Sequence, residues 1–353
     1  MKIGLIGLPY VGKRTLFNIL TGSLFPAGGG GEEQHIGAVR VPDSRLEAIA
    51  AVCGPNVVAE ASITLVAIPG ITAGDERRGR LLGAVREMDA LAQVVRDFGD
   101  EDVSHVSGAV DPIRDIGDLN TEFMLEDLDG VEKRLEKLER ELKRGRDEAR
   151  EKEMAVLLRC RSELDAGRSL AGLDLPAEDE KMVRGFGFIT LKPLLIIVNS
   201  GIDRPGGESV IGEVESAFPG ARAVRVAGKF ELELLDLSPE EARPFMDDLG
   251  MAVGARERVA GALLEAMALI TFFTVNESEL RAWLVRAGTT APEAAGCVHT
   301  DMEKGFIKAE VIAFSDLLDA GSVQAAKAAG RYQLRGKDYV VRDGDIIYFR
   351  FSK

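Results

Sequence analysis

A glycine-bounded loop that ends in lysine is the stretch of this chain best suited to chemistry. Residues 7–13 read Gly-Leu-Pro-Tyr-Val-Gly-Lys, which is the spacing of a phosphate-binding loop. In such a loop, backbone N–H groups and the N-terminus of the next helix attract phosphate oxygens, and the lysine adds a positive charge toward the β- and γ-phosphates. The candidate nucleotide-binding residues here are Gly7, Pro9, Tyr10, Val11, Gly12, Lys13, Arg14 and Thr15.

One residue of this motif departs from the usual pattern. The residue after the lysine is normally Ser or Thr, whose hydroxyl binds Mg²⁺, but here it is Arg14. A guanidinium beside the phosphates could replace part of the magnesium charge and bind phosphate in a bidentate manner. It could equally fill the pocket and exclude nucleotide. Both outcomes stay open, and the sequence predicts no dedicated metal site.

The elements around the loop are those that a phosphate-binding loop requires. Residues 1–6 form an apolar run typical of a buried strand, and residues 14–20 carry apolar side chains at helical spacing. Strand and helix signals then alternate over residues 1–117 and again over residues 188–270. This alternation predicts a doubly wound α/β fold, in which a parallel sheet has helices on both faces.

Two later strands end at the same predicted edge of the sheet. Residues 193–199 form an apolar run that ends in Asn199, and residues 223–227 form a strand that ends at Ala227. Parallel sheets bind ligands at the carboxyl ends of their strands. We therefore include Asn199 and Ala227 in the candidate nucleotide site.

Residues 118–187 differ from the segments on either side. Apolar residues recur at spacings of three and four along residues 119–142, whereas charges of both signs are nearly balanced over residues 131–153. This pattern predicts a long solvated helix with a narrow apolar seam, folded back near Gly145 onto a second helix over residues 151–166. The segment is therefore predicted to be a helical hairpin inserted into the α/β domain.

Residues 271–353 are predicted to form a separate α+β unit of ubiquitin-like size. Strand patterns cover residues 272–275, 279–285 and 306–312, and short helices cover residues 292–295 and 323–329. Residues 339–341 and 346–351 are expected to pair as a hairpin around a turn at 343–344. His299 and Asp301 are interpreted as structural or partner-facing residues.

Composition limits the function classes. A net charge of −14 argues against a protein that coats nucleic acids, and DNA is not an expected partner. There is no secretory leader and no apolar stretch of membrane-spanning length, so no membrane association is expected. Three widely spaced cysteines suit the cytoplasm, where we expect the protein to act.

Several strings along the chain resemble the YchF family of Obg-like P-loop NTPases. They begin with the loop and Thr15-Leu16-Phe17-Asn18, and the densest lies in the C-terminal unit, which looks like the family's TGS domain, a β-grasp fold. The others are residues 105–108, 120–122, 191–193, 290–292, 299–307, 336–341 and 343–345.

The resemblance implies a protein of three parts that associates with ribosomes. These are a G domain over residues 1–117 and 188–270, a coiled-coil arm over residues 118–187, and a TGS domain over residues 271–353. The family binds ATP or GTP and hydrolyses it slowly. Ribosome or RNA contact is expected through the arm and the TGS domain, and the chain is expected to be a monomer.

The chain departs from the family's pattern where the chemistry occurs. Tyr10 replaces an Asn, Arg14 replaces the magnesium-binding Ser, and Ala67 replaces a carboxylate that supports magnesium. Gly70 keeps the glycine that begins switch II. In the first switch, Gly28–Gly31 and Glu32-Glu33-Gln34 contain no Thr. The base-reading carboxylate after Asn199 is also absent.

These losses predict a nucleotide-binding protein with weakened or lost hydrolysis. Magnesium neutralises charge that develops during phosphoryl transfer, so losing its ligands lowers the rate. The catalytic residues are unknown, and the pattern does not favour Mg²⁺ as a cofactor. Two alternatives stay open: a competent NTPase with substitute magnesium ligands, and a nucleotide-free scaffold that binds RNA or the ribosome.

Overall fold

The computed structural model describes residues 1–23, 34–72, 76–202, 207–276 and 278–352. The chain divides into two compact units. The first combines Met1–Gly37 with Thr64–Ala262, and the second combines Ala38–Ile63 with Leu263–Lys353. The sequence patterns did not reveal that residues 38–63 group with the C-terminal segment.

The first unit is built on a parallel sheet. Its strand order is β2-β4-β1-β5-β6-β7, and the ladders that join β4, β1, β5, β6 and β7 are all parallel. Parallel neighbours need crossover connections, which place helices over the faces of the sheet. The predicted doubly wound α/β fold is thus confirmed. The strands are β1 (Lys2–Ile6), β2 (His35–Val41), β4 (Ala61–Ala67), β5 (Ala90–Asp97), β6 (Leu194–Ser200) and β7 (Arg222–Val226).

Helices of the first unit bury the sheet. Leu82 and Val85 of α3 pack with Ile6 and Val66 from the strands. All eight residues of β5 are buried, as expected for a strand covered on both faces. Apart from the arm, the helices are α1 (Lys13–Thr21), α3 (Arg78–Arg86), α7 (Gly207–Ala217), α8 (Gly228–Glu233), α9 (Pro239–Asp248) and α10 (Ala255–Ala266), with a 3-10 turn at Leu234–Asp236.

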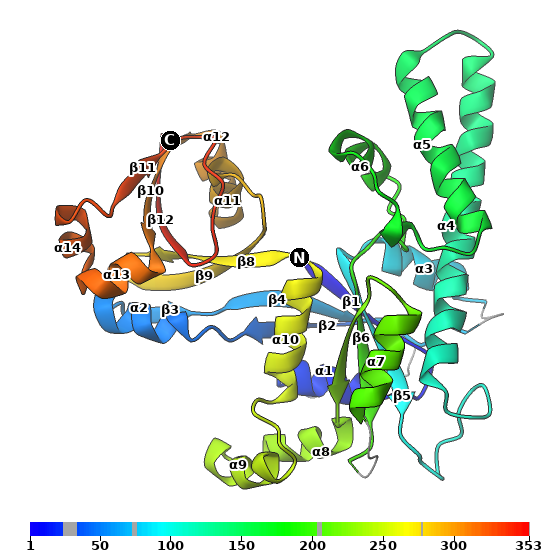
Figure 1. The fold of residues 1–353 in the computed structure, drawn as a ribbon, viewed down its shortest axis with the longest axis horizontal. Coiled ribbons are helices and arrows are strands. Elements are labelled where there is room, and N and C mark those ends of the chain that lie inside the picture. Colours follow the sequence, from blue (N-terminus) through cyan, green and yellow to red (C-terminus); the bar gives the residue numbers. More distant parts are fainter. Residues whose placement is uncertain (24–33, 73–75, 203–206, 277, 353) are drawn as a thin grey trace. The chain divides into compact units, whose positions relative to one another are not determined.

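Two long helices run side by side as the arm (Figure 1). They are α4 (Pro112–Leu142) and α5 (Glu148–Asp165), followed by a 3-10 turn (Leu170–Gly172) and α6 (Ala177–Arg184). The seam predicted from the sequence is present, because Leu135 and Leu138 are buried with Leu157 of α5. The first turns of α4 instead pack on the sheet, so one continuous helix joins the sheet to the arm.

The start of α4 carries a clear local signal. The Asp111 side chain accepts a hydrogen bond from the Arg114 N–H at 3.1 Å, and Pro112 occupies the first turn. Asp at the N-cap followed by Pro is a favourable helix start. The helix therefore begins before residue 118, the predicted first residue of the arm.

The second unit has a mixed sheet with strand order β11-β10-β12-β8-β9-β3. β3, from the early segment, pairs in parallel with β9, which explains the grouping of residues 38–63 with this unit. Its strands are β3 (Val57–Ala59), β8 (Leu269–Val275), β9 (Glu279–Arg286), β10 (Phe306–Ala313), β11 (Gln333–Arg335) and β12 (Asp345–Phe351). Its helices are α2 (Arg45–Cys53), α11 (Ala291–Val298), α12 (Thr300–Lys304), α13 (Phe314–Ala320) and α14 (Val323–Ala328).

The hairpin predicted for residues 339–351 is wrong. β12 pairs antiparallel with β10 and parallel with β8, and Val340 forms an isolated bridge with Thr290. The Asp345 carboxylate accepts hydrogen bonds from the Tyr339 hydroxyl at 2.7 Å and from the Arg342 N–H at 2.9 Å. These bonds fold the preceding residues into a loop instead of a strand.

Among the helices that the structure describes, none is both long enough and apolar enough to span a bilayer.

Candidate functional site

The glycine-bounded loop lies between the end of β1 and the start of α1, as its sequence predicts. Gly7 and Gly12 have φ values of 143° and 94°, which L side chains rarely adopt. A Cβ on Gly7 would collide with the Val94 carbonyl oxygen, and one on Gly12 would collide with the Asn199 amide. The loop can therefore keep this path only with glycine at both positions.

Tyr10 is the strained residue of the loop. Its φ of 63° is left-handed, which costs a residue with a Cβ about 1 kcal/mol. Its side chain is 68% exposed, so little packing offsets the strain. Asn tolerates this conformation better than Tyr, and Asn is the residue expected here from the family pattern. A strained residue in a loop of this kind points to a functional constraint on the backbone.

Asn199 braces the loop from the end of β6. Its side-chain amide donates to the Val11 carbonyl at 2.9 Å and accepts from the Gly228 N–H at 3.1 Å. The side chain is buried, with 4% of the residue exposed, and so positions the backbone of the glycine-bounded loop and of the start of α8. Ala227, next to Gly228, donates its N–H to Glu231 at 3.0 Å.

Lys13 is held inside the loop. Its Nζ donates to the carbonyls of Gly7 at 2.9 Å and Leu8 at 2.7 Å. Burial lowers the pKa of Lys13 to about 7, because removal from water disfavours the charged form. Contact with phosphate would require Lys13 to exchange these carbonyls for phosphate oxygens, which would favour the charged form.

A cavity of about 610 Å³ opens beside the loop. Of the predicted residues, Pro9, Tyr10, Gly12, Lys13, Arg14 and Gly70 line it. The remaining predicted residues are not part of its wall, namely Gly7, Val11, Thr15, Asn199 and Ala227. Val11 and Asn199 are buried in the brace described above. The structure thus separates residues that face the cavity from residues that shape the loop.

Arg77 and the loop after β5 complete the cavity wall and were missed by sequence reasoning. The wall includes Arg77, Phe98, Asp100 and Val103, together with residues 67–69. A signal for the loop after β5 was available, because ligands bind at the carboxyl ends of parallel strands. Arg77 carried no such signal, since it lies in a segment without a recognisable motif.

Arg96 organises the loop after β5. Its guanidinium donates to the carbonyls of Phe98 at 3.1 Å and Val103 at 2.9 Å, and lies 4.6 Å from the centre of the Phe98 ring. Farther along, His105 Nε2 lies 2.8 Å from Asp115 of α4, and both side chains are buried. The loop between β5 and α4 therefore lines the cavity with its first residues and is anchored to α4 by its later residue His105.

The charges of the cavity suit an anion and do not suit magnesium. Among the residues whose positions the structure describes, Lys13, Arg14 and Arg77 line it together with one carboxylate, Asp100. Magnesium prefers hydroxyl, carboxylate and water oxygens, but Arg14 and Ala67 stand where a hydroxyl and a carboxylate would be needed. Among the residues with described positions, no three His, Cys, Asp or Glu gather into a metal-binding group. The residues present therefore fit phosphate better than a metal ion.

The first-switch prediction lies partly outside the described residues. Gly28–Gly31, Glu32 and Glu33 fall in the undescribed range 24–33. Gln34 is described and directly precedes β2.

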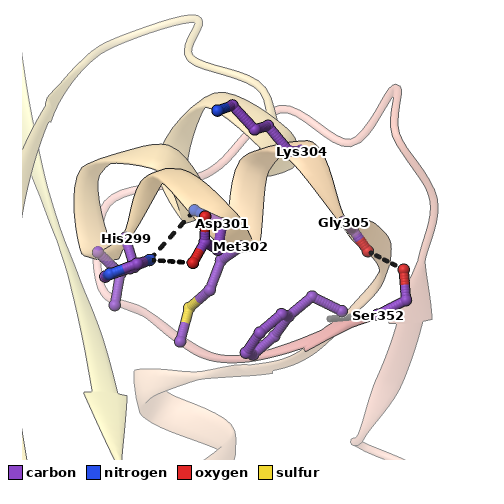
Figure 2. A pocket seen from close by; sticks show the side chains of 8 residues that line it. His299, Asp301, Met302, Lys304, Gly305 and Ser352 are labelled. Carbon is purple, nitrogen blue, oxygen red and sulfur yellow. Dashed lines mark hydrogen bonds and ion pairs between the residues drawn. The ribbon is translucent and has the colours of Figure 1, made fainter.

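A second cavity, of about 880 Å³, lies in the C-terminal unit (Figure 2). Met302 and Phe351 contribute apolar surface, and Lys304 also lines the cavity. His299 and Asp301 are joined here, because His299 Nδ1 accepts from the Asp301 N–H at 3.1 Å and caps α12. This hydrogen bond gives His299 a structural role, as interpreted from the sequence.

Several basic side chains on the arm have carboxylate partners. Lys133 lies 2.6 Å from Asp129, and Arg134 lies 2.6 Å from Glu153. Near the tip, Arg146 lies 3.1 Å from Glu151. These pairs are typical of a solvated helical surface of mixed charge.

Comparison with known proteins agrees with this architecture. Residues 269–352 match the family model YchF-GTPase_C, which is described as a protein of unknown function (DUF933). The protein called ribosome-binding ATPase YchF from Haemophilus influenzae is 38% identical over 360 residues, which cover 99% of both chains. Obg-like ATPase 1 from Oryza sativa is 33% identical over 377 residues, covering 100% of this chain and 92% of the relative.

A solved structure extends the likeness to the fold. The YchF GTPase of Schizosaccharomyces pombe superposes with a TM-score of 0.86 at 30% identity, covering 99% of this chain and 97% of the other. Because sequence and fold agree over nearly the whole length, the chain belongs to the YchF family of Obg-like P-loop NTPases.

Proposed function

We propose that this protein binds a purine nucleoside triphosphate at the cavity beside residues 7–13, and that it does so without a magnesium ion. The observation that carries the proposal is the composition of the cavity wall. Lys13, Arg14 and Arg77 line it, and the hydroxyl and carboxylate that would hold magnesium are replaced. The names of the relatives, which include ATPases and a GTPase, support nucleotide binding in this family.

The phosphates would take the place of the internal partners of Lys13. Its hydrogen bonds to the Gly7 and Leu8 carbonyls satisfy a buried amino group, and a polyphosphate would favour the protonated form and bind it more strongly through opposite charge. Arg14 lies in the first turn of α1, where the helix N-terminus also attracts anions. Arg77, in the same cavity wall, would add a third positive charge for the anion.

Hydrolysis is proposed to be weak. Magnesium bridges the β- and γ-phosphates and neutralises charge that builds up during phosphoryl transfer. Arginine can supply positive charge, but it cannot lower the pKa of a bound water or bridge two phosphates as a metal does. We therefore expect binding with slow turnover or none.

The base is proposed to be held without strong selection between adenine and guanine. The side-chain amide of Asn199 is used by Val11 and Gly228, so it shapes the site instead of reading a base. The residue at the position of the family's base-reading carboxylate is Ile202, which is 43% exposed and offers no acceptor.

Ribosome association is proposed from the relatives. The bacterial relative is called ribosome-binding, and the alignment covers nearly all of both chains. We extend this association to the present protein and therefore place its action in the cytoplasm. We also propose that it acts as a monomer, as expected from the sequence. The arm and the C-terminal unit are the parts proposed to contact the ribosome.

Calorimetric titration with ATP and with GTP tests nucleotide binding. Wild-type protein should bind both, and Lys13→Met should weaken binding at least tenfold, as expected for the loss of about 1.5–3 kcal/mol from a charge-assisted hydrogen bond. Lys2→Met is the matched control, because Lys2 is exposed and does not line the cavity. Equal affinities of Lys13→Met and wild-type protein would show that the nucleotide binds elsewhere.

A further inference from the structure

Exposed apolar side chains are concentrated in the first unit around α9. Of the 19 large apolar side chains that are exposed in the described part of the chain, five lie within residues 235–253, called here the α9 segment. Single exposed apolar side chains are normal, whereas a group of them is typical of a surface that another molecule covers. The five are Leu235, Leu237, Phe245, Leu249 and Val253, which are between 37% and 52% exposed.

The helix α9 forms with little burial of its own. All ten of its residues are described, and Ala242 is the only one that is buried. Local hydrogen bonds hold the start of the helix instead. The Ser238 hydroxyl accepts from the Glu241 N–H at 3.3 Å, and the Glu241 carboxylate accepts from the Ser238 N–H at 2.9 Å. This capping box stabilises the helix without covering its exposed side, and α9 lies at the outer edge of the first unit (Figure 1).

Phe245 and Leu249 form an apolar stripe on the exposed side of α9. They are four positions apart, which places them next to each other on a helix. Phe245 is 52% exposed, and aromatic side chains of this kind are enriched in the cores of protein interfaces. Glu241 is four positions before Phe245 and Asp248 is three positions after it, so carboxylates border the stripe.

Charge determines which partner can cover this apolar stripe. The α9 segment has five carboxylates and one cation, a surplus of four negative charges. The carboxylates are those of Asp236, Glu240, Glu241, Asp247 and Asp248. The cation, Arg243, is paired with Asp247 at 2.9 Å. The surplus repels RNA and anionic lipid, and the same surface of a second copy would bring like charges together.

We infer that the α9 segment binds a basic polypeptide segment that also carries apolar side chains, supplied by a protein of the ribosome. This inference rests on the proposed ribosome association, because a ribosome presents RNA and basic proteins, and the acidic segment repels the RNA. Apolar side chains of the partner would cover Phe245 and Leu249, and its cations would pair with Glu240 and Asp248. Burial of apolar area would supply affinity, and opposite charge would orient the partner.

Anisotropy titration of full-length protein tests the apolar stripe. The probe is a fluorescein-labelled peptide of leucine and lysine at the spacing of an amphipathic helix. Phe245→Ala with Leu249→Ala should weaken binding at least tenfold, because two apolar side chains are no longer available for burial. Leu125→Ala with Leu158→Ala is the matched control and should keep the wild-type affinity, since these leucines of α4 and α5 are similarly exposed, at 53% and 41%.

Charge reversal tests the carboxylates separately. Glu240→Lys with Asp248→Lys leaves the apolar stripe intact and should weaken binding at least tenfold at low salt, with a smaller effect when added salt screens the charges. Glu87→Lys with Glu213→Lys is the charge-matched control, because both side chains are exposed on the same unit outside the α9 segment. Equal weakening in the two double variants would show that only the net charge of the protein matters, and would overturn the inference.

Three further peptide results would contradict the inference. These are no binding by wild-type protein, equal affinity for a peptide of the same composition with scrambled spacing, and tighter binding of a labelled oligouridine than of the peptide. Thermal unfolding of each variant shows whether it keeps the fold.

Ribosome pelleting tests the source of the partner. Wild-type protein should pellet with ribosomes, and the charge-reversal variant of the α9 segment should pellet less than the Glu87→Lys, Glu213→Lys control. Equal pelleting of both variants and wild-type protein would overturn the inference and leave the ribosome association intact. Failure of wild-type protein to pellet would instead overturn the ribosome association, and with it the ribosomal source of the partner.

Discussion

At the scale of single residues, the burial of Lys13 disfavours the charged form of its side chain. Its pKa is lowered to about 7, so the side chain is mostly neutral at pH 8. A polyphosphate next to it would raise that pKa again. ATP binding at pH 8 should therefore take up close to one proton per nucleotide, measured by calorimetry in buffers of different ionisation enthalpy. Lys13→Met should abolish the uptake, and wild-type binding without uptake would show that Lys13 does not meet the phosphates.

The same residue predicts a pH dependence of stability. The pKa of Lys13 is lower in the folded state than its ordinary value of 10.5, so the unfolded state binds the proton more tightly. Stability should consequently rise with pH between about 7 and 10 through this group, because the unfolded chain carries the extra proton there. Denaturant unfolding should show a smaller rise in Lys13→Met. An equal rise in both proteins would contradict the burial argument.

Replacing Gly12 should cost stability in two ways, through backbone strain and through a collision of the added Cβ with Asn199, and a suitable control can distinguish the two contributions. Gly12→Ala adds a Cβ at a left-handed φ and against the Asn199 amide, so it should cost about 3 kcal/mol in the free energy of unfolding. Gly54→Ala is the control: Gly54 has a φ of 62° with no atom within 4 Å of the added Cβ, so about 1 kcal/mol is expected. Similar costs in the two variants would mean that the Asn199 brace contributes little.

Five of the thirteen residues that line the cavity could be predicted from the loop motif alone, namely Pro9, Tyr10, Gly12, Lys13 and Arg14. Glycine spacing, a strand before it and a helix after it are local properties, so Gly7 to Arg14 are readable from sequence. The brace by Asn199 and the contribution of Arg77 depend on contacts between distant segments. Val11 and Asn199, for example, are 188 positions apart.

At the scale of elements, Asp127 joins helix α4 to the segment that precedes β6. It is fully buried in α4 and accepts hydrogen bonds from the Ile189 N–H, the Thr190 N–H and the Thr190 hydroxyl, each at 2.8 Å. Asp127→Ala leaves three buried donors unpaired and should lower the free energy of unfolding by about 3 kcal/mol. Hydrogen exchange should speed up at residues 189 and 190.

Asp129 is the matched control for that change. It lies two positions along the same helix, is exposed, and pairs at the surface with Lys133. Asp129→Ala should change stability by less than about 0.5 kcal/mol. If both variants unfolded at the same denaturant concentration, the Asp127 contacts would not hold the base of the arm.

Periodicity predicted the arm but not its first residue. The apolar seam of α4 and α5 follows from spacings of three and four, which a sequence displays directly. The helix start at Asp111-Pro112 was equally readable as a capping signal. The false hairpin at residues 339–351 had a different cause, because the pairing of β12 with β8 and β10 is a choice among distant strands that turn signals cannot settle.

At the scale of the whole molecule, the second unit is built from two separate segments of the chain, residues 38–63 and 263–353, which the sequence patterns did not indicate. Residues 38–63 join the second unit through the β3–β9 ladder and through Arg45, whose guanidinium lies 2.7 Å from Asp343. Arg45 also lies over the Phe273 ring at 5.3 Å. Such long-range partners leave no periodic trace in a single sequence.

Arg45→Gln should therefore destabilise the second unit. A partly exposed ion pair with a stacked ring is expected to contribute about 1 kcal/mol. Arg281→Gln is the comparison, since Arg281 also stacks on a ring and pairs with a carboxylate, but within one strand. Thermal unfolding should show the larger shift for Arg45→Gln, and the reverse order would argue that residues 38–63 add little to the second unit.

Arg14 is the residue on which the account depends most. We propose that this side chain, in place of a hydroxyl that would bind magnesium, allows the protein to bind its nucleotide without a metal ion. The most direct test is calorimetric titration of ATP into wild-type protein and Arg14→Ser, each with excess Mg²⁺ and with a chelator. We predict that wild-type protein binds ATP at least as tightly with the chelator as with Mg²⁺. Binding by wild-type protein that requires Mg²⁺ would contradict the account.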